Sequence, residues 1–229
     1  MGRSSLEHPA NYLISNLWNI MRVNYDGLND FVDESLRLAN STSKNIERKI
    51  KKWDNKHPKH EYSGHDIYEK DFYSLVHFSN LATTSALILA HSELEISLKD
   101  ICTSFGEEMK KKIRLKDIKG FGKIDQCKNY LEKVLELNFN LQTKEWEEIF
   151  LFNRLRNILV HQNGMISVAE NQKIEKADDF VKLSKIANVR IDTSGKLTLV
   201  DEKPVKNFIK VSWSVVDNIC TQLRRDLAS

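Results

Sequence analysis

The sequence contains few residues that interrupt helices. Among 229 residues there are only three prolines and eight glycines. Because these two residues are the strongest breakers of regular structure, their scarcity favours long helices. Cysteine is also scarce: there are three, with no CxxC spacing. An odd, unpatterned set argues against a disulfide framework and indicates reduced, semi-buried thiols.

Long apolar runs are missing as well. No stretch approaches the roughly 18 apolar residues of a membrane span, and residues 1–9 lack the apolar segment of a signal peptide. We therefore expect a cytoplasmic protein with no membrane association. A formal net charge of +3 is too small to indicate nucleic acid by itself. A chain of this length can bury a core without metal or disulfide support, and we expect no cofactor and no metal site.

Apolar residues recur at helical spacing over most of the chain. Helices are expected in five ranges: 9–53, 69–105, 123–137, 144–163 and 204–227. A single helix over 9–53 would be about 66 Å long, so we expect a break near Gly27 or at residues 40–43. The centre of the second helix, 81–98, is apolar on nearly all sides, which indicates burial in a core or an interface.

Residues 187–200 have a different pattern. Val189 and Ile191 alternate with polar residues, a Gly-containing turn follows, and Leu197 and Leu199 continue the alternation. This pattern predicts an exposed β-hairpin peripheral to any site. The sequence thus predicts a mainly α protein, a bundle with long antiparallel helices and a small hairpin near 187–200. We expect one domain over 1–229, with its core at 70–165, a helical extension at 9–53 and a hairpin plus helix at 187–227.

The helix expected at 144–163 has two distinct sides. On a wheel of 100° per residue, its core face contains Leu151, Phe152, Leu155, Ile158 and Leu159. The opposite side contains Asn153, Arg154, Asn157 and His161. Trp146, Phe150 and Val160 lie among or beside these polar residues. A polar cluster ringed by apolar residues suggests a second buried surface.

Residues 156–161 read RNILVH, an arginine and asparagine followed after three residues by histidine, at the end of this helix. Here the chain resembles the HEPN superfamily, whose signature is an arginine, four to six residues, then a histidine, commonly with a polar residue after the arginine. Upstream, KGFGKIDQCKNYL resembles the turn and short helix that often precede the motif, and HSELEISLKDI resembles the family's second core helix. The resemblance covers about residues 70–165; the two ends match only in being helical.

The resemblance implies a helical bundle that dimerises so that two motifs face one cleft. Many members are metal-independent endoribonucleases, which implies an RNA substrate, a homodimer, and Arg156, Asn157 and His161 as catalytic residues. The residue types suit this chemistry. An imidazole with a pKa of ~6.5 can move a proton at neutral pH, a guanidinium can hold a phosphate, and an amide can orient the histidine. The family also implies a toxin or antiviral defence effector, with an antitoxin or another regulatory partner.

The choice of arginine stays open. Arg156 and His161 are five residues apart, about 140° around a straight helix, so we expect them not to share a face. Arg154 is seven residues before His161, only about 20° away, and fits the longer form of the signature. Arg156 is preferred because Asn157 follows it; Arg154 is the alternative, or a second phosphate contact. Glu95 lies where many family members carry an acidic residue; it is either a buttress for the arginine or an ordinary polar residue of the helix.

Two basic runs, 44–59 and 110–123, are either solvated faces or guides for an RNA backbone. In the second run Lys119 and Lys123 are candidate substrate contacts, and Phe121 could stack on a base. His57, His60 and His65 fit no zinc-ligand spacing, so a solvated loop is the better interpretation of 54–66.

Other functions compete with the endoribonuclease. One is a non-catalytic HEPN-like dimer that binds RNA, a nucleotide or a protein partner. Another is an unrelated helical scaffold with a chance motif. Some HEPN toxins carry a modifiable tyrosine two residues after the histidine; here that position is Asn163, which argues against regulation by that route.

Overall fold

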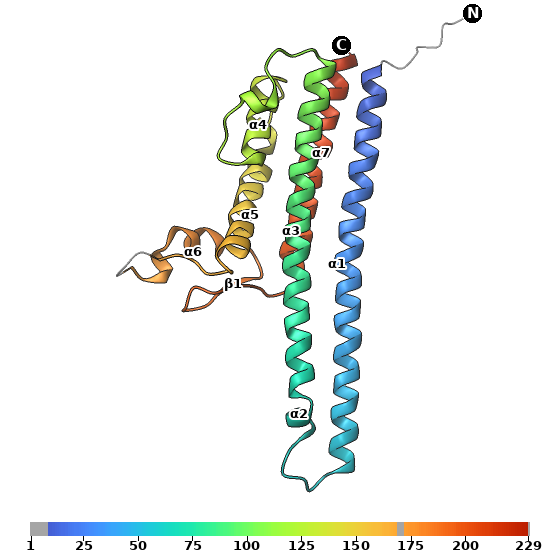
Figure 1. Ribbon diagram of the computed structural model, residues 1–229, viewed down its shortest axis with the longest axis vertical. Coiled ribbons are helices and arrows are strands. Elements are labelled where there is room, and N and C mark those ends of the chain that lie inside the picture. The colour runs from blue at the N-terminus through green and yellow to red at the C-terminus, as the bar shows by residue number, and fades with distance from the viewer. Residues whose placement is uncertain (1–8, 169–171, 229) are drawn as a thin grey trace, which may run out of the picture.

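Long helices dominate the computed structural model, which describes residues 9–168 and 172–228 (Figure 1). The α-helices are α1 (Pro9–Lys56), α2 (Gly64–Ile67), α3 (Glu69–Glu108), α4 (Lys123–Lys133), α5 (Thr143–His161), α6 (Asp178–Leu183) and α7 (Lys203–Ala228). Short 3-10 helices occupy Leu115–Asp117 (η1), Asn140–Gln142 (η2) and Ile174–Lys176 (η3). Two strands, β1 (Val189–Ile191) and β2 (Leu197–Leu199), complete the structure. The predicted mainly α class is confirmed.

The helices form a bundle around α3. Helices α1 and α7 run beside α3 on one side, and α4 and α5 lie on the other (Figure 1). One continuous apolar core extends from Ile14 of α1 through Leu94 of α3 to Leu223 of α7. Trp18 of α1 also donates a hydrogen bond of 2.7 Å to Asp217 of α7. Both terminal helices, expected as extensions of the core, therefore contribute to it directly.

The expected break in the first helix is wrong. Helix α1 is continuous over 48 residues, which is about 72 Å at 1.5 Å per residue. Gly27 lies within it, where an added Cβ would meet no atom within 4 Å, and the Ser41 hydroxyl bonds back to the Leu38 carbonyl within the same helix. Buried residues on both sides of these positions, such as Val32 and Ile46, pack α1 onto its neighbours. Tertiary packing therefore outweighs the weak local preference for a break.

The predicted hairpin is present, but it is only partly exposed. β1 and β2 pair antiparallel with Val189 opposite Leu199, at the side of the bundle (Figure 1). Leu197 and Leu199 are buried in the core, so the expectation of an exposed hairpin is wrong for β2. The apolar alternation that identified the strands also marks the face that packs inward.

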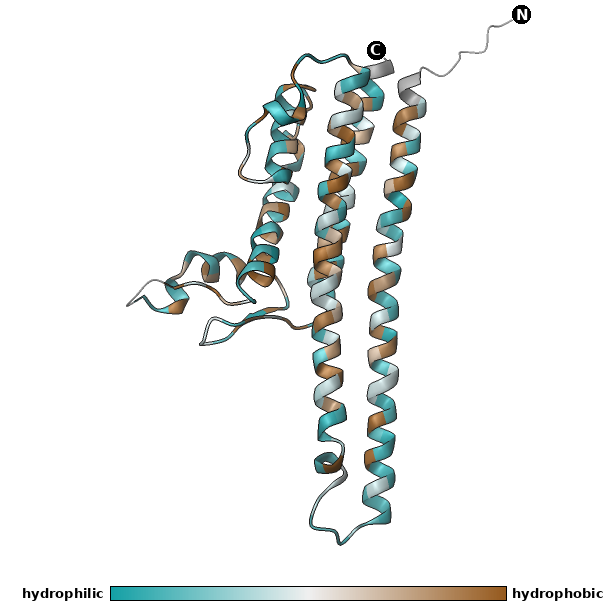
Figure 2. Ribbon diagram, viewed as in Figure 1, coloured by the Kyte–Doolittle hydropathy of each residue, from teal (hydrophilic) through white to brown (hydrophobic). Residues whose placement is uncertain are grey.

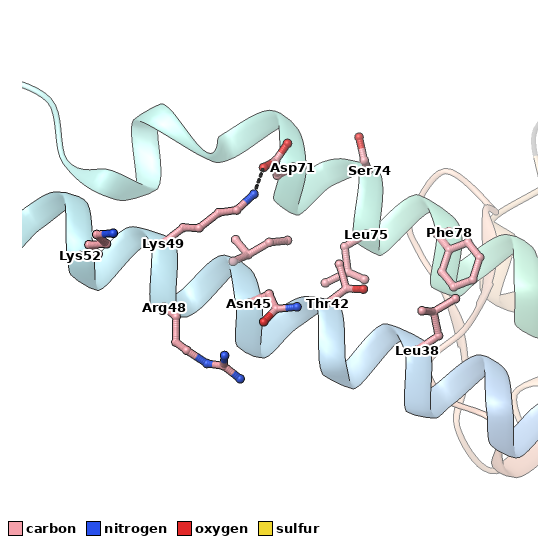
Figure 3. A pocket seen from close by; sticks show the side chains of 11 residues that line it. Leu38, Thr42, Asn45, Arg48, Lys49, Lys52, Asp71, Ser74, Leu75 and Phe78 are labelled. Atoms are coloured by element: carbon pink, nitrogen blue, oxygen red, sulfur yellow. Dashed lines mark ion pairs between the residues drawn. The ribbon is translucent and has the colours of Figure 1, made fainter.

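Helices α1 and α3 extend, joined by α2, beyond the end of the other helices (Figure 1). We call this two-helix projection, residues 38–78, the arm. Lys49 of α1 and Asp71 of α3 form an ion pair of 3.7 Å across it, beside a groove of about 740 Å³ between the two helices (Figure 3). Within the described residues, no helix combines the length and apolar composition needed to span a membrane.

Candidate functional site

Helix α5 positions the motif by burying one side against the bundle. The buried residues of this helix are Trp146, Ile149, Phe152, Leu155 and Ile158. The predicted core face is therefore correct at its centre, with Leu151 and Leu159 half-buried at its edges. Trp146 and Phe150, expected beside the polar cluster, instead pack on each other with ring centroids 6.1 Å apart. They do not form a second apolar surface around the motif.

The end of α5 is fixed by a tight turn. Asn163 and Gly164 both have left-handed backbone angles, with φ of 51° and 73°, which suits an asparagine followed by glycine. The Gly164 amide donates to the Ile158 carbonyl at 2.9 Å, and its carbonyl accepts from the Leu197 amide of β2 at 2.8 Å. The hairpin is thus bonded directly to the segment that follows His161.

Arg156, Asn157 and His161 form one cluster on the surface of α5. The Nη1 atom of Arg156 donates to Asn157 Oδ1 at 3.0 Å and lies 3.3 Å from His161 Nε2. Arg156 and His161, expected on different faces of α5, meet here because the long arginine side chain spans the turn between them. A guanidinium can only donate hydrogen bonds. His161 Nε2 therefore accepts here, and its lone pair lies beside the positive charge of Arg156.

The Arg156 side chain retains unused bonding capacity. Its Nε atom is buried and has no hydrogen-bond partner within the described part of the chain. Asn157 and His161, in contrast, are exposed. A hollow of about 390 Å³ begins beside this end of α5, between α3 and β2, lined by His77, Leu159 and Gly164 among others.

Arg154 points elsewhere. Its guanidinium forms ion pairs with Asp178 and Asp179 at the start of α6. The hydrogen bond that Arg154 donates to Asp179 raises the pKa of Arg154, and the two negative charges act in the same direction. Of the two candidate arginines, Arg156 lies beside His161 and Arg154 joins α5 to α6.

A buried histidine behind the motif was not singled out from the sequence. His91 of α3 is 1% exposed, and its Nε2 lies 2.9 Å from Asn153 Oδ1 of α5. Burial lowers the pKa of His91, and the nearby charge of Arg156 lowers it further, while Glu95 and Asn153 act against this. The available signal was a titratable residue inside the apolar run 81–98, where a side chain of this kind needs a specific partner.

Glu95 contacts this histidine rather than the arginine. Its Oε1 lies 4.0 Å from His91 Nδ1, and no ion pair joins it to Arg156 within the described residues. Glu95 also lines a separate hollow between α3 and α4, together with Lys123. The expected direct buttress of the arginine is therefore replaced by a row of groups, Glu95, His91 and Asn153, that ends next to Arg156.

The remaining predicted residues lie away from the motif. Lys119 and Phe121 are exposed on the loop before α4, and the side chain of Phe121 is fully exposed to solvent. At the tip of the arm, His57 packs at a tilt against Trp53 and His60 meets it edge-on, with ring centroids 4.6 Å and 5.0 Å away. Within residues 9–168 and 172–228, no cluster of histidine, cysteine and carboxylate side chains has the arrangement of a metal site.

Comparison of this chain with protein-family models, with curated proteins and with solved structures gave no match. A function can therefore be inferred only from the residues themselves and from the geometry of the Arg156, Asn157 and His161 cluster.

Proposed function

We propose that this protein is a HEPN-type, metal-independent endoribonuclease that acts as a symmetric homodimer. The observation that carries the proposal is the 3.3 Å approach of Arg156 Nη1 to His161 Nε2, with Asn157 holding the same guanidinium group. A proton acceptor and a phosphate-binding cation thus lie side by side on an exposed helix end. A toxin or defence effector restrained by an antitoxin or another regulatory partner is the cellular role that we attach to this proposal.

The arrangement suits cleavage by the 2′-hydroxyl of RNA. His161 Nε2 takes the proton of the 2′-hydroxyl as its oxygen bonds to the adjacent phosphorus. The bond from phosphorus to the 5′-oxygen then breaks, and the departing oxygen takes a proton from an imidazolium, which the second motif of a dimer would supply. Arg156 offsets the charge that develops on the non-bridging phosphate oxygens. The products are a 2′,3′-cyclic phosphate and a 5′-hydroxyl.

The proposed dimer is supported by an uncovered face of α3. Phe78, Leu81 and Leu89 are spaced by about one and two helical turns along α3 and are all exposed. Figure 2 shows hydrophobic residues recurring along the length of α3. A row of exposed apolar side chains along one side of a helix is typical of an association site. Helix α5 also packs on α3, and the proposal includes a two-fold axis at this face that brings both motifs to one cleft.

The test is cleavage of a single-stranded RNA by the purified protein. His161→Ala should reduce the rate by about 10²- to 10⁴-fold, the usual contribution of general acid–base catalysis, and Arg156→Ala should be comparably damaging. Cleavage should persist in EDTA, leave 2′,3′-cyclic phosphate ends, and fail on a DNA strand that lacks the 2′-hydroxyl.

His65→Ala is the matched control, because this exposed histidine lies in α2 on the arm. It should cleave at the wild-type rate. Wild-type cleavage by His161→Ala would refute the mechanism. Absence of RNA cleavage by every preparation would favour the non-catalytic, RNA-binding or protein-binding dimer.

A further inference from the structure

The hollow between α3 and α4 is a second candidate site, separate from the motif. It has a volume of about 870 Å³ and lies between the last turns of α3, η1 and the first turns of α4. This volume falls within the roughly 300–1,000 Å³ of small-molecule pockets, and it exceeds what an inorganic ion would fill.

The walls of this hollow are fixed by hydrogen bonds from α4 to the segment that contains η1. The Gln126 amide donates to the carbonyls of Leu115 and Ile118 at 3.1 Å and 2.8 Å. The Tyr130 hydroxyl donates to the Ile113 carbonyl at 3.1 Å. A segment held at three points along its backbone does not need to be ordered by a ligand, so the hollow is formed in advance.

The lining is basic. Lys99, Arg114, Lys116 and Lys123 line the hollow against two carboxylates, Glu95 and Glu107. Arg114 is paired with Glu107 at 3.4 Å, whereas none of the three lysines forms an ion pair within the described residues. The pKa of the Cys127 thiol is lowered first by a hydrogen bond from Cys102 and then by Lys123 and Lys99. The ammonium groups of Lys99 and Lys123 therefore both lie near Cys127, on the same side of the hollow.

We propose that this hollow binds a nucleoside 5′-monophosphate, either free or as the 5′ end of an RNA strand. A phosphate monoester carries about −1.5 to −2 charges at pH 7, which matches an excess of two positive charges in the lining. Ile96, which is exposed, and Leu115, which is half-buried, offer apolar contacts for the sugar and base. Lys99 and Lys123 hold the phosphate, because a cation gives an exposed phosphate its strongest hydrogen bonds.

The hollow is connected to the motif by the row of groups described above. Glu95 lines the hollow and approaches His91, which bonds to Asn153 one turn before Arg156. In the RNA form of the proposal, the strand runs from its 5′ end in the hollow over the surface of the protein towards His161. This RNA form of the proposal rests on the proposed ribonuclease function, whereas binding of a free nucleotide does not.

The experiment measures binding to the full-length His161→Ala protein, so that cleavage cannot alter the probe. Two eight-nucleotide RNAs with a 3′ fluorophore are compared by anisotropy, one with a 5′-phosphate and one with a 5′-hydroxyl. The 5′-phosphate should tighten binding by about tenfold or more, and Lys99→Glu or Lys123→Glu should remove this preference. Lys112→Glu, an exposed control in the same basic run and outside the lining, should keep it.

AMP distinguishes the two sources of the ligand. Displacement of the 5′-phosphorylated RNA by AMP below millimolar concentration shows a site for the free nucleotide. A retained 5′-phosphate preference without such displacement assigns the site to the RNA end. Equal affinity for both RNAs together with no AMP binding would overturn the proposal, as would equal losses in Lys112→Glu and Lys123→Glu. RNA cleavage by the wild-type protein is measured in a separate assay. The nucleotide-binding proposal and the ribonuclease proposal can therefore each fail independently of the other.

Discussion

At the scale of single residues, His91 is a neutral imidazole enclosed by charged groups. Its Nε2 is bonded to Asn153, and its buried Nδ1 lacks a hydrogen-bond partner in the described residues. Glu95 favours protonation, but burial and Arg156 oppose it, and the pKa of His91 falls below its ordinary value. The folded protein therefore binds a proton at His91 less readily than the unfolded chain does.

This depressed pKa predicts a pH-dependent stability. The contribution of neutral His91 to the stability of the folded protein is fully present above about pH 6.5, the pKa of histidine in the unfolded chain. It is lost as the pH falls towards the pKa of His91 in the folded protein, because the unfolded chain then binds a proton that the folded protein does not. As the pH falls below about 6.5, the free energy of unfolding should decrease by up to about 1.4 kcal/mol per pH unit from this group. His91→Gln, which retains a donor for Asn153, should flatten the profile measured by urea denaturation.

His77→Gln is the control for this measurement. His77 lies on the same helix and is exposed, so its replacement should leave the pH profile as in the wild type. Identical profiles for wild type and His91→Gln would contradict the assignment of His91 as the responsible group.

Arg154 offers a second test at this scale. If it serves mainly to hold α6, Asp179→Asn should lower RNA cleavage by the same factor as Arg154→Ala, and by less than Arg156→Ala. If Arg154 were instead the functional arginine, Asp179→Asn would release it and leave cleavage intact. Initial rates on one RNA substrate decide between these outcomes.

At the scale of elements, helix α3 shows how far sequence reasoning extends. The apolar character of 81–98 on all sides indicated a core or an interface, and the structure buries one half of it, including Leu87 and Leu94, while Leu81 and Leu89 stay exposed. Periodicity located the helix and its end near Gly106. It could not assign the uncovered side, because this depends on where α1 and α5 pack.

The arrangement of the motif was likewise only partly predictable from the sequence. The hexapeptide 156–161 was visible in the sequence, but the wheel placed Arg156 and His161 apart because it represents each residue only by its direction at Cα. The choice between Arg154 and Arg156 depended on Asp178 and Asp179, which lie about 25 residues downstream and are unrelated to the helical repeat. The local sequence pattern could therefore predict neither the reach of the long Arg156 side chain nor the distant ion-pair partners of Arg154.

The junction of α3 and α4 gives a prediction about an element. A Cβ on Gly106 would lie 2.2 Å from the Tyr130 hydroxyl, which bonds to the η1 segment. Gly106→Ala should therefore reduce the free energy of unfolding by about 1–3 kcal/mol, the usual range for overpacking. Tyr130→Phe removes the clashing oxygen, so the double variant should lose less than the two single variants combined.

Gly27→Ala is the matched control, because no atom lies within 4 Å of the Cβ it would add. In the middle of α1 this change should stabilise the protein by up to about 1 kcal/mol. Additive losses in the Gly106 and Tyr130 variants, measured by chemical denaturation, would show that the predicted clash does not exist.

At the scale of the whole molecule, the arm has its own charge. Residues 44–59 contain seven lysines and arginines against two acidic residues, although the whole chain has a formal net charge of only +3. Among these seven, Lys49 is the one that forms an ion pair in the described residues. Figure 3 shows Lys49 directed across the groove towards Asp71. The basic end of the arm is thus distant in the fold from the basic α3–α4 hollow, and the two runs seen in the sequence occupy different ends of the bundle.

The last prediction concerns the dimer. Leu89 is 49% exposed at the centre of the uncovered face of α3. In a symmetric interface each substitution occurs twice, and loss of a buried leucine costs about 2 kcal/mol. Leu89→Asp should therefore weaken dimerisation by on the order of a thousandfold, given about 1.4 kcal/mol per factor of ten. Light scattering at micromolar concentration should show a dimer for the wild type and a monomer for this variant.

Val23→Asp provides the comparison, because Val23 is 68% exposed on α1 and lies outside this face; that variant should remain dimeric. The monomeric Leu89→Asp protein should also lose RNA cleavage, although Leu89 is not one of the motif residues, because one motif alone lacks the second imidazole that protonates the departing oxygen. Cleavage at the wild-type rate by a proven monomer would refute the two-motif cleft while leaving His161 as the base. A wild-type protein that is monomeric at these concentrations would remove the dimer from the proposal altogether.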